Sequence, residues 1–366
     1  MNKICLIGNS GKRSKANDGQ DTKVKLYKKK IEDEGNIVSF VDLDDIKKRP
    51  LFVFNEIRRG VKSCNRIVLI TAERGIKVLL PFINIINKRH KKPIILPMIG
   101  VNILHKYLDK LNEKQHADFM LNKNYYLHPK KKDVKELSKI SFILAENEVV
   151  ANCVKGFYGL SNVRILENFR DFPLKKLLHK KEKNILKLVY FSRVNKEKGI
   201  LNLLRAVLEL QKEGKNIKLD IFGKMLLTGA DLLEFNSALS DSITYKGIAD
   251  AKKSVEILSK YDCFVFPTLF LSEGTPGVIS EALIAGTPII SSNFIQSKCI
   301  LENKKNSFIY NISEKDGLKK AIIKFYNGEL NIGVLSNNCY ESATRFTYES
   351  IRDDFCKVVC GMNAHN

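Results

Sequence analysis

The sequence has no tryptophan, no C-x-x-C pair and no long uninterrupted apolar run. Its longest apolar stretch, residues 78–86, contains Pro81 and Asn84 and is far shorter than the roughly 20 residues that a helix needs to cross a bilayer. We therefore expect no transmembrane helix. Only four apolar residues in a row precede Gly8, too few for the core of a signal peptide, and they predict a first β-strand instead.

Paired or metal-bound cysteines are also not expected. The eight cysteines are scattered along the chain, and Cys5 and Cys263 fall inside apolar runs that predict buried strands. This distribution argues against a disulfide framework and against a zinc knuckle, and it fits a reducing cytoplasm. The histidines lie in lysine-rich or polar surroundings without the spacing of metal ligands.

The composition is that of a folded protein of two domains. The chain has 366 residues, of which 44% are hydrophobic and 28% charged. Its net charge of +22 is unevenly distributed. Residues 1–183 hold 39 basic and 20 acidic residues, a net +19, whereas residues 184–366 hold 23 and 20, a net +3. The first half therefore favours an anionic partner.

Short apolar runs alternate with amphipathic stretches in both halves, a pattern typical of parallel sheets covered by helices on both faces. The apolar runs predict ten strands, at residues 3–8, 37–42, 66–71, 93–98, 142–145, 186–192, 218–223, 243–246, 263–267 and 288–291. Residues 23–34 are typical of a helix, and we expect the chain after Thr287 to be mostly helical. The predicted fold class is α/β, with two Rossmann-like doubly wound domains facing a cleft.

A charged stretch with little predicted structure separates the two domains. The predicted division is residues 1–171 for the first domain, 172–184 for the linker, 185–345 for the second domain and 346–366 for a C-terminal segment. Since open α/β sheets bind ligands at the carboxyl ends of their strands, we expect the cleft to be the functional site.

Residues 261–288 are the most informative segment. An apolar strand leads into a glycine-containing loop and then a helix, for which Thr275 is the predicted N-cap and Pro276 the first residue. The backbone N–H groups of Gly277 and Val278 would then be free at the helix start, where an anion can bind.

Two carboxylates flank this anion site. Glu273 precedes the helix and Glu281 lies about five residues inside it, some ~7.5 Å further along the axis. Carboxylates bind diols, and helix N–H groups bind phosphate. The arrangement therefore fits a nucleotide diphosphate-sugar, with a ribose at one end, a sugar at the other and two phosphates between them.

Two basic residues follow the first strand of the second domain. Arg193 and Lys198 stand in a strand–loop–helix segment, residues 188–199, that leads to the same cleft. When a glycosidic bond to phosphate breaks, the leaving diphosphate gains negative charge, so two fixed cations stabilise the transition state more than the ground state. Such a design requires no metal ion, and we expect no metal and no cofactor.

These residues carry a family resemblance. Residues 273–282, with Gly274 following the first carboxylate, resemble the E-x7-E signature of the retaining GT-B glycosyltransferases of the large family 4. Arg193 and Lys198 match the paired basic residues of that family. The resemblance implies that Glu273 contacts hydroxyls of the donor sugar, that Glu281 contacts the ribose, and that the two basic residues hold the diphosphate.

Supporting matches extend over most of the chain. Gly19 and Gln20 resemble the glycine loop after the first strand, with one glycine where relatives often have two, and residues 162–169 resemble the strand and loop that close the first domain. Gly223, Gly247 and Ile248 look like parts of the loops that border the nucleotide. The resemblance also implies that the last helix, around residues 350–359, returns to the first domain. Many members have a Gly-Gly or His-bearing loop after the fourth strand; here that loop, residues 98–105, ends in His105.

Other readings of these features remain. Asp42-Leu43-Asp44 has the D-x-D form that binds a divalent ion in another glycosyltransferase architecture, but helix capping is the simpler interpretation.

A nucleotide-sugar epimerase or a phosphorylase would share the fold. An epimerase needs acid and base groups facing the cleft, and a phosphorylase usually has a much longer chain. A basic nucleic-acid-binding protein would account for the charge, but no aromatic RNA platform, zinc ligand set or recognition helix is present. The full set of charged site residues speaks against a catalytically silent subunit.

We therefore expect a glycosyltransferase of hexosyltransferase type that moves a sugar to a glycan or lipid-linked glycan with retention, by front-face attack. The resemblance points to capsule, O-antigen or exopolysaccharide synthesis.

Lysine runs at residues 28–30, 91–92 and 130–132 lie in the basic half. Each such residue near anionic lipid contributes about 1 kcal/mol, so we expect a cytoplasmic protein that is peripheral at the inner face of the membrane.

Overall fold

The computed structural model describes residues 1–11, 19–173, 184–271 and 273–362, which form two compact units. The first unit consists of residues 1–168 together with the chain from Tyr348 onward, and the second of Phe169–Thr347. The two ends of the second unit lie within three residues of the predicted end of the first domain and start of the C-terminal segment, but the predicted linker, residues 172–184, falls within the second unit. Residues 174–183 of that linker are outside the described residues.

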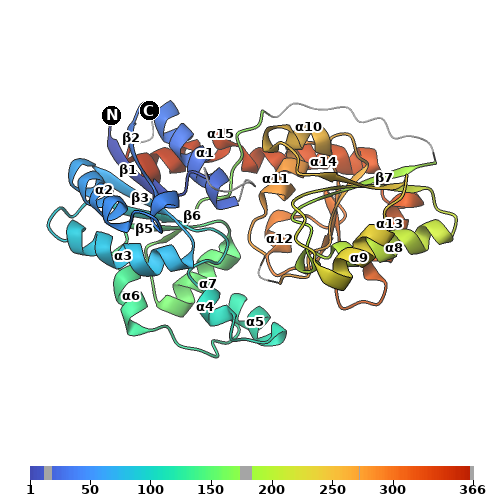
Figure 1. The fold of residues 1–366 in the computed structure, drawn as a ribbon, viewed down its shortest axis with the longest axis horizontal. Coiled ribbons are helices and arrows are strands. Elements are labelled where there is room, and N and C mark those ends of the chain that lie inside the picture. The colour runs from blue at the N-terminus through green and yellow to red at the C-terminus, as the bar shows by residue number, and fades with distance from the viewer. Residues whose placement is uncertain (12–18, 174–183, 272, 363–366) are drawn as a thin grey trace. The chain divides into compact units, whose positions relative to one another are not determined.

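In the described part of the first unit, six parallel strands form one sheet in the order β2-β1-β3-β4-β5-β6, with helices on both faces (Figure 1). The strands are β1 (Lys3–Gly8), β2 (Ile37–Asp42), β3 (Arg66–Ile70), β4 (Ile94–Pro97), β5 (Phe142–Ala145) and β6 (Val163–Ile165). The helices are α1 (Gly19–Asp33), η1 (Leu43–Asp45), α2 (Pro50–Ser63), α3 (Glu73–Asn87), α4 (His105–Leu108), α5 (Glu113–Met120), α6 (Lys131–Leu137), α7 (Glu148–Tyr158), α15 (Tyr348–Phe355) and η5 (Cys356–Cys360).

The second unit repeats this architecture, with strand order β12-β11-β10-β7-β8-β9. Its strands are β7 (Leu186–Phe191), β8 (Ile217–Phe222), β9 (Ile243–Gly247), β10 (Cys263–Phe266), β11 (Ile289–Ser292) and β12 (Ser307–Tyr310). Its helices are η2 (Lys196–Lys198), α8 (Ile200–Lys212), α9 (Gly229–Ser237), η3 (Ala251–Lys253), α10 (Ser254–Leu258), α11 (Gly277–Ile284), α12 (Ser297–Ile300), α13 (Gly317–Tyr326), α14 (Ile332–Ala343) and η4 (Thr344–Phe346).

The central strands are apolar along their whole length because helices cover both sides of them. All four residues of β10, Cys263–Phe266, are buried, and so are the five residues that follow Lys3 in β1. Side chains alternate between the faces of a strand, so a run without polar residues requires an apolar layer on each side. The ten strands expected from the sequence are all present, with ends shifted by a residue or so.

The chain after Thr287 is mostly helical, as expected, but it also contains β12, which was not predicted and which pairs in parallel with β11. Two expectations about where helices start are wrong. Helix α1 starts at Gly19, so that Gly19 and Gln20 lie in its first turn, although the helix was expected from Lys23. Helix α11 starts at Gly277 with Pro276 as its N-cap, because the ψ of 126° at Pro276 is extended and cannot belong to the first helical turn.

The C-terminal segment packs on the beginning of the chain within the first unit. Arg352 donates two hydrogen bonds to Glu34, at 2.7 and 2.9 Å, and the Tyr348 hydroxyl donates a third at 3.0 Å. The ring of Phe355 meets that of Tyr27 edge-on, 5.2 Å between centroids. The last helix is therefore an integral part of the first unit.

Candidate functional site

The strand order of the second unit places a topological switch point at β7. From β7 the chain moves outward to β8 and β9, and it then returns to β10 on the other side of β7. The loops after β7 and β10 leave the sheet in opposite directions at this switch point, and ligands of open α/β sheets bind there. The segments that hold Lys198 and Glu273 are these two loops.

The loop after β7 holds Lys198 rigidly. Asn195 caps η2, its side-chain oxygen accepting from the Lys198 N–H at 3.1 Å. The next residue, Gly199, has a φ of +73°, which lets α8 begin at once in a new direction. The Lys198 side chain is only 8% exposed, and its ammonium lies 5.6 Å from the centre of the Phe266 ring.

Lys198 and Glu273, 75 positions apart, form a buried ion pair. The ammonium of Lys198 donates to Oε2 of Glu273, and the Thr268 hydroxyl donates to the same oxygen at 3.1 Å. The loops that carry them are joined by a hydrogen bond from the Leu269 N–H to the Glu197 carbonyl, 2.8 Å. The carboxylate thus stands at a fixed place beside a cation, with 13% of its side chain exposed.

Arg193 lies in the same neighbourhood, with an exposed side chain. The hydroxyl of the buried Tyr190 donates to the Arg193 carbonyl at 2.7 Å. Burial raises the pKa of Tyr190; the charge of Glu273 raises it further, and the charge of Arg193 acts in the opposite direction. Both charges therefore act on one hydroxyl group, so the structure brings Arg193, Lys198 and Glu273 to one end of the sheet.

The glycines expected to border the nucleotide lie at the same carboxyl edge. The Gly223 N–H donates to the Gly247 carbonyl at 2.8 Å, which joins the ends of β8 and β9. A Cβ on Gly223 would come within 1.7 Å of the Ser192 carbonyl oxygen, so the loops after β7 and β8 touch only because this residue has no side chain. Ile248 follows Gly247 and is 57% exposed.

Glu281 has a different partner, Arg170, which the sequence analysis did not single out. Nε of Arg170 donates to Oε1 of Glu281 at 3.1 Å, and both side chains are largely buried. Burial raises the pKa of Glu281, against the effect of Arg170 and of a hydrogen bond from Ser254. A Cβ on Gly277 would overlap the guanidinium of Arg170, at 1.3 Å. The start of α11, with Val278 as its second residue, therefore has a cation packed against it.

The connection between Glu273 and α11 is short. Gly274, Thr275 and Pro276 span it, and Thr275 is buried. Asp171 and Arg170 follow β6 without a recognisable motif, so nothing in the sequence pattern indicated that Arg170 would reach α11.

The carboxyl edge of the first sheet holds a second buried ion pair, also missed from the sequence. Nζ of Lys23 donates to Oε1 of Glu146 at 2.7 Å and to the Met98 carbonyl at 2.6 Å. The Gly100 N–H donates to the other Glu146 oxygen at 3.3 Å. The pair joins α1 to the segments after β4 and β5. One feature of the sequence could have indicated this ion pair: Glu146 is a charged residue that directly follows the apolar strand β5 and precedes Asn147, the N-cap of α7.

His105 is the first residue of α4 and is half-buried. Its charge acts on His116, whose pKa is lowered mainly by burial. The predicted role of His105 in the site remains a prediction. Of the glycine loop after β1, residues 12–18 lie outside the described residues.

Loss of the Lys23–Glu146 pair should reduce stability. The Lys23→Met substitution leaves a buried carboxylate without its cation, and we expect the free energy of unfolding to fall by about 3–5 kcal/mol. The double substitution Lys23→Met/Glu146→Met should cost less than Lys23→Met alone, because the buried carboxylate is removed together with the ammonium that pairs with it. Urea denaturation measures both; equal stability of Lys23→Met and the unchanged protein would contradict the prediction.

Within the described ranges, no group of three or more His, Cys, Asp or Glu side chains could hold a metal ion. Asp42 accepts from the Asp44 N–H at 3.1 Å and caps η1, which confirms the capping interpretation of the D-x-D sequence.

Among the described residues, no helix is both long and apolar enough to cross a membrane.

Comparison with known proteins supports this reading of the second unit. Residues 186–328 match the family model described as Glycosyl transferases group 1. An uncharacterized glycosyltransferase of Methanocaldococcus jannaschii is 25% identical over 256 residues, 63% of this chain and 56% of the relative. A UDP-Gal:alpha-D-GlcNAc-diphosphoundecaprenol alpha-1,3-galactosyltransferase of Escherichia coli is 31% identical over 83 residues, 23% of this chain and 21% of the relative. The matches thus span little more than half of one curated relative and about a fifth of the other.

Solved structures match the whole chain. The Anabaena HepE protein in complex with UDP has a TM-score of 0.72 at 14% identity, covering 98% of this chain and 100% of that one. Sucrose-phosphate synthase from Thermosynechococcus elongatus has a TM-score of 0.70 at 14% identity over 99% of both chains. The lipopolysaccharide outer core galactosyltransferase WaaB has a TM-score of 0.66 at 15% identity, over 98% and 99%. The fold is GT-B, as the sequence predicted.

Proposed function

We propose that this protein is a glycosyltransferase that moves a sugar from a nucleotide diphosphate-sugar to a glycan or lipid-linked glycan. The observation that carries the proposal is the buried contact between Lys198 and Glu273 at the switch point of the second sheet. The match of residues 186–328 to Glycosyl transferases group 1 covers both residues. The binding of UDP by a neighbour of the same fold supports a nucleotide-sugar donor.

The site can perform the reaction with the groups it has. Lys198 and Arg193 bind the diphosphate and stabilise the charge that it gains as the bond between the sugar C1 and the phosphate oxygen breaks. The acceptor oxygen bonds to C1, and the acceptor proton passes to the departing diphosphate. Glu273 holds the sugar hydroxyls, and Glu281 holds the ribose. Attack from the face that the diphosphate leaves retains the configuration, and no covalent nucleophile is needed.

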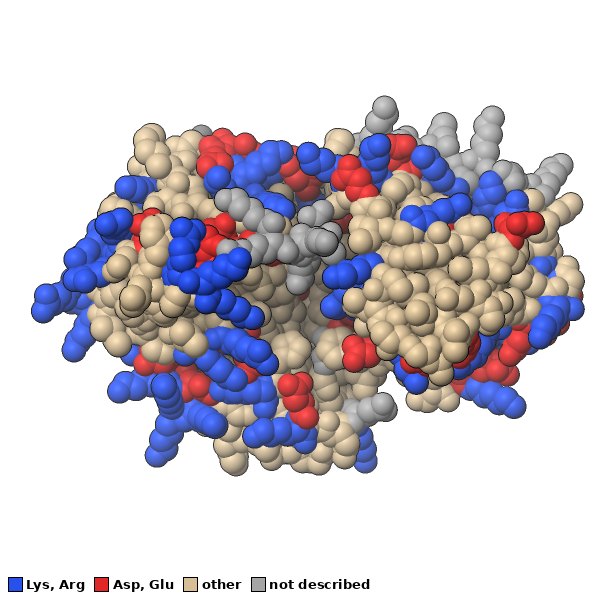
Figure 2. Space-filling view, viewed as in Figure 1, with Lys and Arg blue, Asp and Glu red and all other residues tan. Residues whose placement is uncertain are grey.

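The acceptor is proposed to be lipid-linked, in capsule, O-antigen or exopolysaccharide synthesis. The name of the E. coli relative specifies a diphosphoundecaprenol acceptor. The basic residues of the first half, a net charge of +19, favour a membrane with anionic lipids. Figure 2 shows Lys and Arg side chains over much of the visible face of the first unit. We infer a peripheral enzyme at the cytoplasmic face.

A panel of nucleotide diphosphate-sugars tests the donor site by thermal stabilisation. A true donor at 100 times its Kd should stabilise the folded protein by about 2.7 kcal/mol. Lys198→Ala should abolish this shift. Lys196→Ala is the matched control, because Lys196 lies two positions away with 71% of its side chain exposed. Stabilisation by single-stranded nucleic acid and by no nucleotide sugar would overturn the proposal.

Product analysis separates transfer from epimerisation. With the donor found in this way, a transferase releases the free nucleoside diphosphate when it transfers the sugar to an acceptor. Without an acceptor, it does so only by transferring the sugar to water. An epimerase instead returns a nucleotide sugar or nucleoside diphosphate and an altered sugar without any acceptor. Chromatography of the products with and without a lipid-diphosphate glycan distinguishes the two activities.

A further inference from the structure

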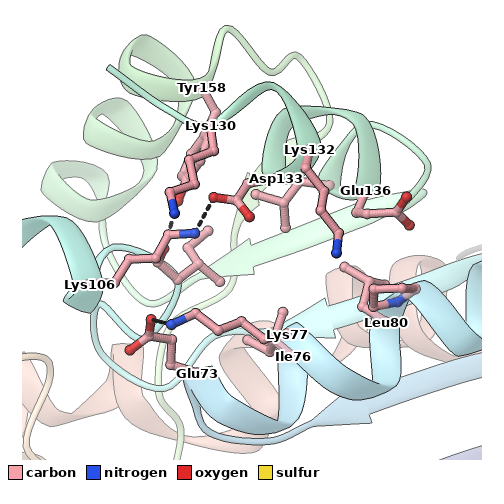
Figure 3. A pocket seen from close by; sticks show the side chains of 13 residues that line it. Glu73, Ile76, Lys77, Leu80, Lys106, Lys130, Lys132, Asp133, Glu136 and Tyr158 are labelled. Carbon is pink, nitrogen blue, oxygen red and sulfur yellow. Dashed lines mark hydrogen bonds and ion pairs between the residues drawn. The ribbon is translucent and has the colours of Figure 1, made fainter. Parts of the chain in front are cut away.

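The first unit contains a pocket of about 300 Å³ that the proposed chemistry does not use. It lies among α3, α4, α6 and the end of α7 (Figure 3). Its apolar lining consists of Ile76, Leu80, Pro81, Ile103 and Leu137, with the body of Tyr158. Charged side chains line the rest of the pocket, namely Glu73, Lys77, Lys106, Lys130, Lys132, Asp133 and Glu136.

The three carboxylates of this pocket are already paired. Asp133 accepts from the Lys106 ammonium, and from the Tyr107 hydroxyl at 2.8 Å. Although burial opposes it, these two donors hold the pKa of Asp133 below its usual value, so the carboxylate is ionised at neutral pH. Glu73 pairs with Lys77 at 2.5 Å, and Glu136 accepts from Asn84 at 2.6 Å and from Lys139 at 2.8 Å.

Two lysines of the pocket are left over. Among the described residues, no ion pair engages the ammonium groups of Lys130 and Lys132. Four lysines against three carboxylates give the pocket lining a net charge of +1. Because Glu136 is paired with Lys139, which lies outside the lining, both Lys130 and Lys132 remain to bind the phosphate of a phosphodiester.

The apolar surface continues from the pocket onto α3. Lys77 and Pro81 are among the residues of α3 that line the pocket. Successive residues of a helix are rotated by about 100° around its axis. Val78 and Ile85 therefore lie on the neighbouring stripe of the same helix, and they are 56% and 73% exposed. Val78 and Ile85 offer further apolar contact to a hydrocarbon chain that leaves the pocket in this direction.

We propose that this pocket binds one anionic phospholipid, with its phosphate on Lys130 and Lys132 and its acyl chain over the apolar lining of α3. A free phosphate would not use the apolar lining, and a neutral lipid would not use the excess positive charge. The site lies wholly within the first unit, so it does not depend on the proposed transfer reaction. It gives the membrane a specific contact in addition to general attraction to basic residues.

Isothermal titration with monomeric short-chain lipid tests the site. Dihexanoyl phosphatidylglycerol should bind, whereas dihexanoyl phosphatidylcholine and glycerol phosphate should bind at least tenfold more weakly. Lys130→Gln/Lys132→Gln should weaken binding of the anionic lipid about tenfold, a loss of about 1.4 kcal/mol. Val78→Ser should weaken it without any change of charge, by loss of chain contact.

Lys47→Gln/Lys48→Gln is the matched control. It removes the same charge from two neighbouring exposed lysines of the same unit, outside the pocket, and should leave the lipid affinity within twofold. Equal weakening by both double variants, equal binding of glycerol phosphate, or preference for a polyprenyl diphosphate would overturn the proposal. Stabilisation by the nucleotide-sugar donor should be unchanged in every variant, so this test and that of the transfer reaction can fail separately.

Discussion

Glu273→Gln is expected to lower the transfer rate by about 10²–10³-fold, a loss of roughly 3–4 kcal/mol of transition-state stabilisation. The substitution preserves shape but replaces the charged oxygen, to which Lys198 and Thr268 donate, with a neutral amide. The cation then loses its fixed partner, and the donor sugar loses a charged acceptor for its hydroxyls. Steady-state kinetics with the identified donor measures the effect.

Lys198→Ala should have an effect of similar size on transfer, since it removes the cation proposed to hold the diphosphate. It also leaves Glu273 charged and poorly exposed, so the melting temperature must be measured in parallel. Glu197→Gln is the matched control, because its exposed side chain lies one position away. Activity of Glu273→Gln close to that of the unchanged protein, in a folded variant, would remove the assigned role.

Gly199→Ala is the second substitution with a large expected effect. A Cβ at this position would lie 1.9 Å from the carbonyl oxygen of Pro267, in the loop after β10. The φ of +73° is unfavourable for alanine as well. The loops after β7 and β10 must therefore separate, which moves Lys198 away from Glu273. We expect a loss of about 3 kcal/mol of stability together with loss of donor binding.

Comparison with Gly214→Ala separates the steric part of this effect from the part that is due to the positive φ. Gly214 has a similar φ of +79°, but no atom lies within 4 Å of the position of its Cβ. It should therefore lose only about 1–2 kcal/mol and keep its donor affinity. Urea denaturation and donor titration of both variants make the comparison. Equal losses in the two would show that contact between the loops does not position the site.

The sequence predicted those parts of the molecule that depend on local pattern. Buried parallel strands are apolar on both faces, so all ten expected strands could be located. The two strand–loop–helix segments predicted that Lys198 and Glu273 face the same cleft, but not that they contact each other directly. The strand Ser307–Tyr310 was missed because four residues with a polar first position do not stand out beside helical segments.

The remaining parts depend on contacts between distant segments. Arg170 meets Glu281 across 111 positions, and Lys23 meets Glu146 across 123. A single charged residue carries no periodicity that would indicate its partner. The start of α11 was placed one residue early because proline is common at the first helical position, and only the backbone angle of Pro276 shows that it is the N-cap here.

The docking of α15 on the first unit also sets an order for synthesis. Glu34 is translated more than three hundred positions before its partners Tyr348 and Arg352. The second unit is thus an insertion into the first, and it can fold while the first is still incomplete. Until Phe355 has been translated, the ring of Tyr27 lacks the edge-on contact that Phe355 provides.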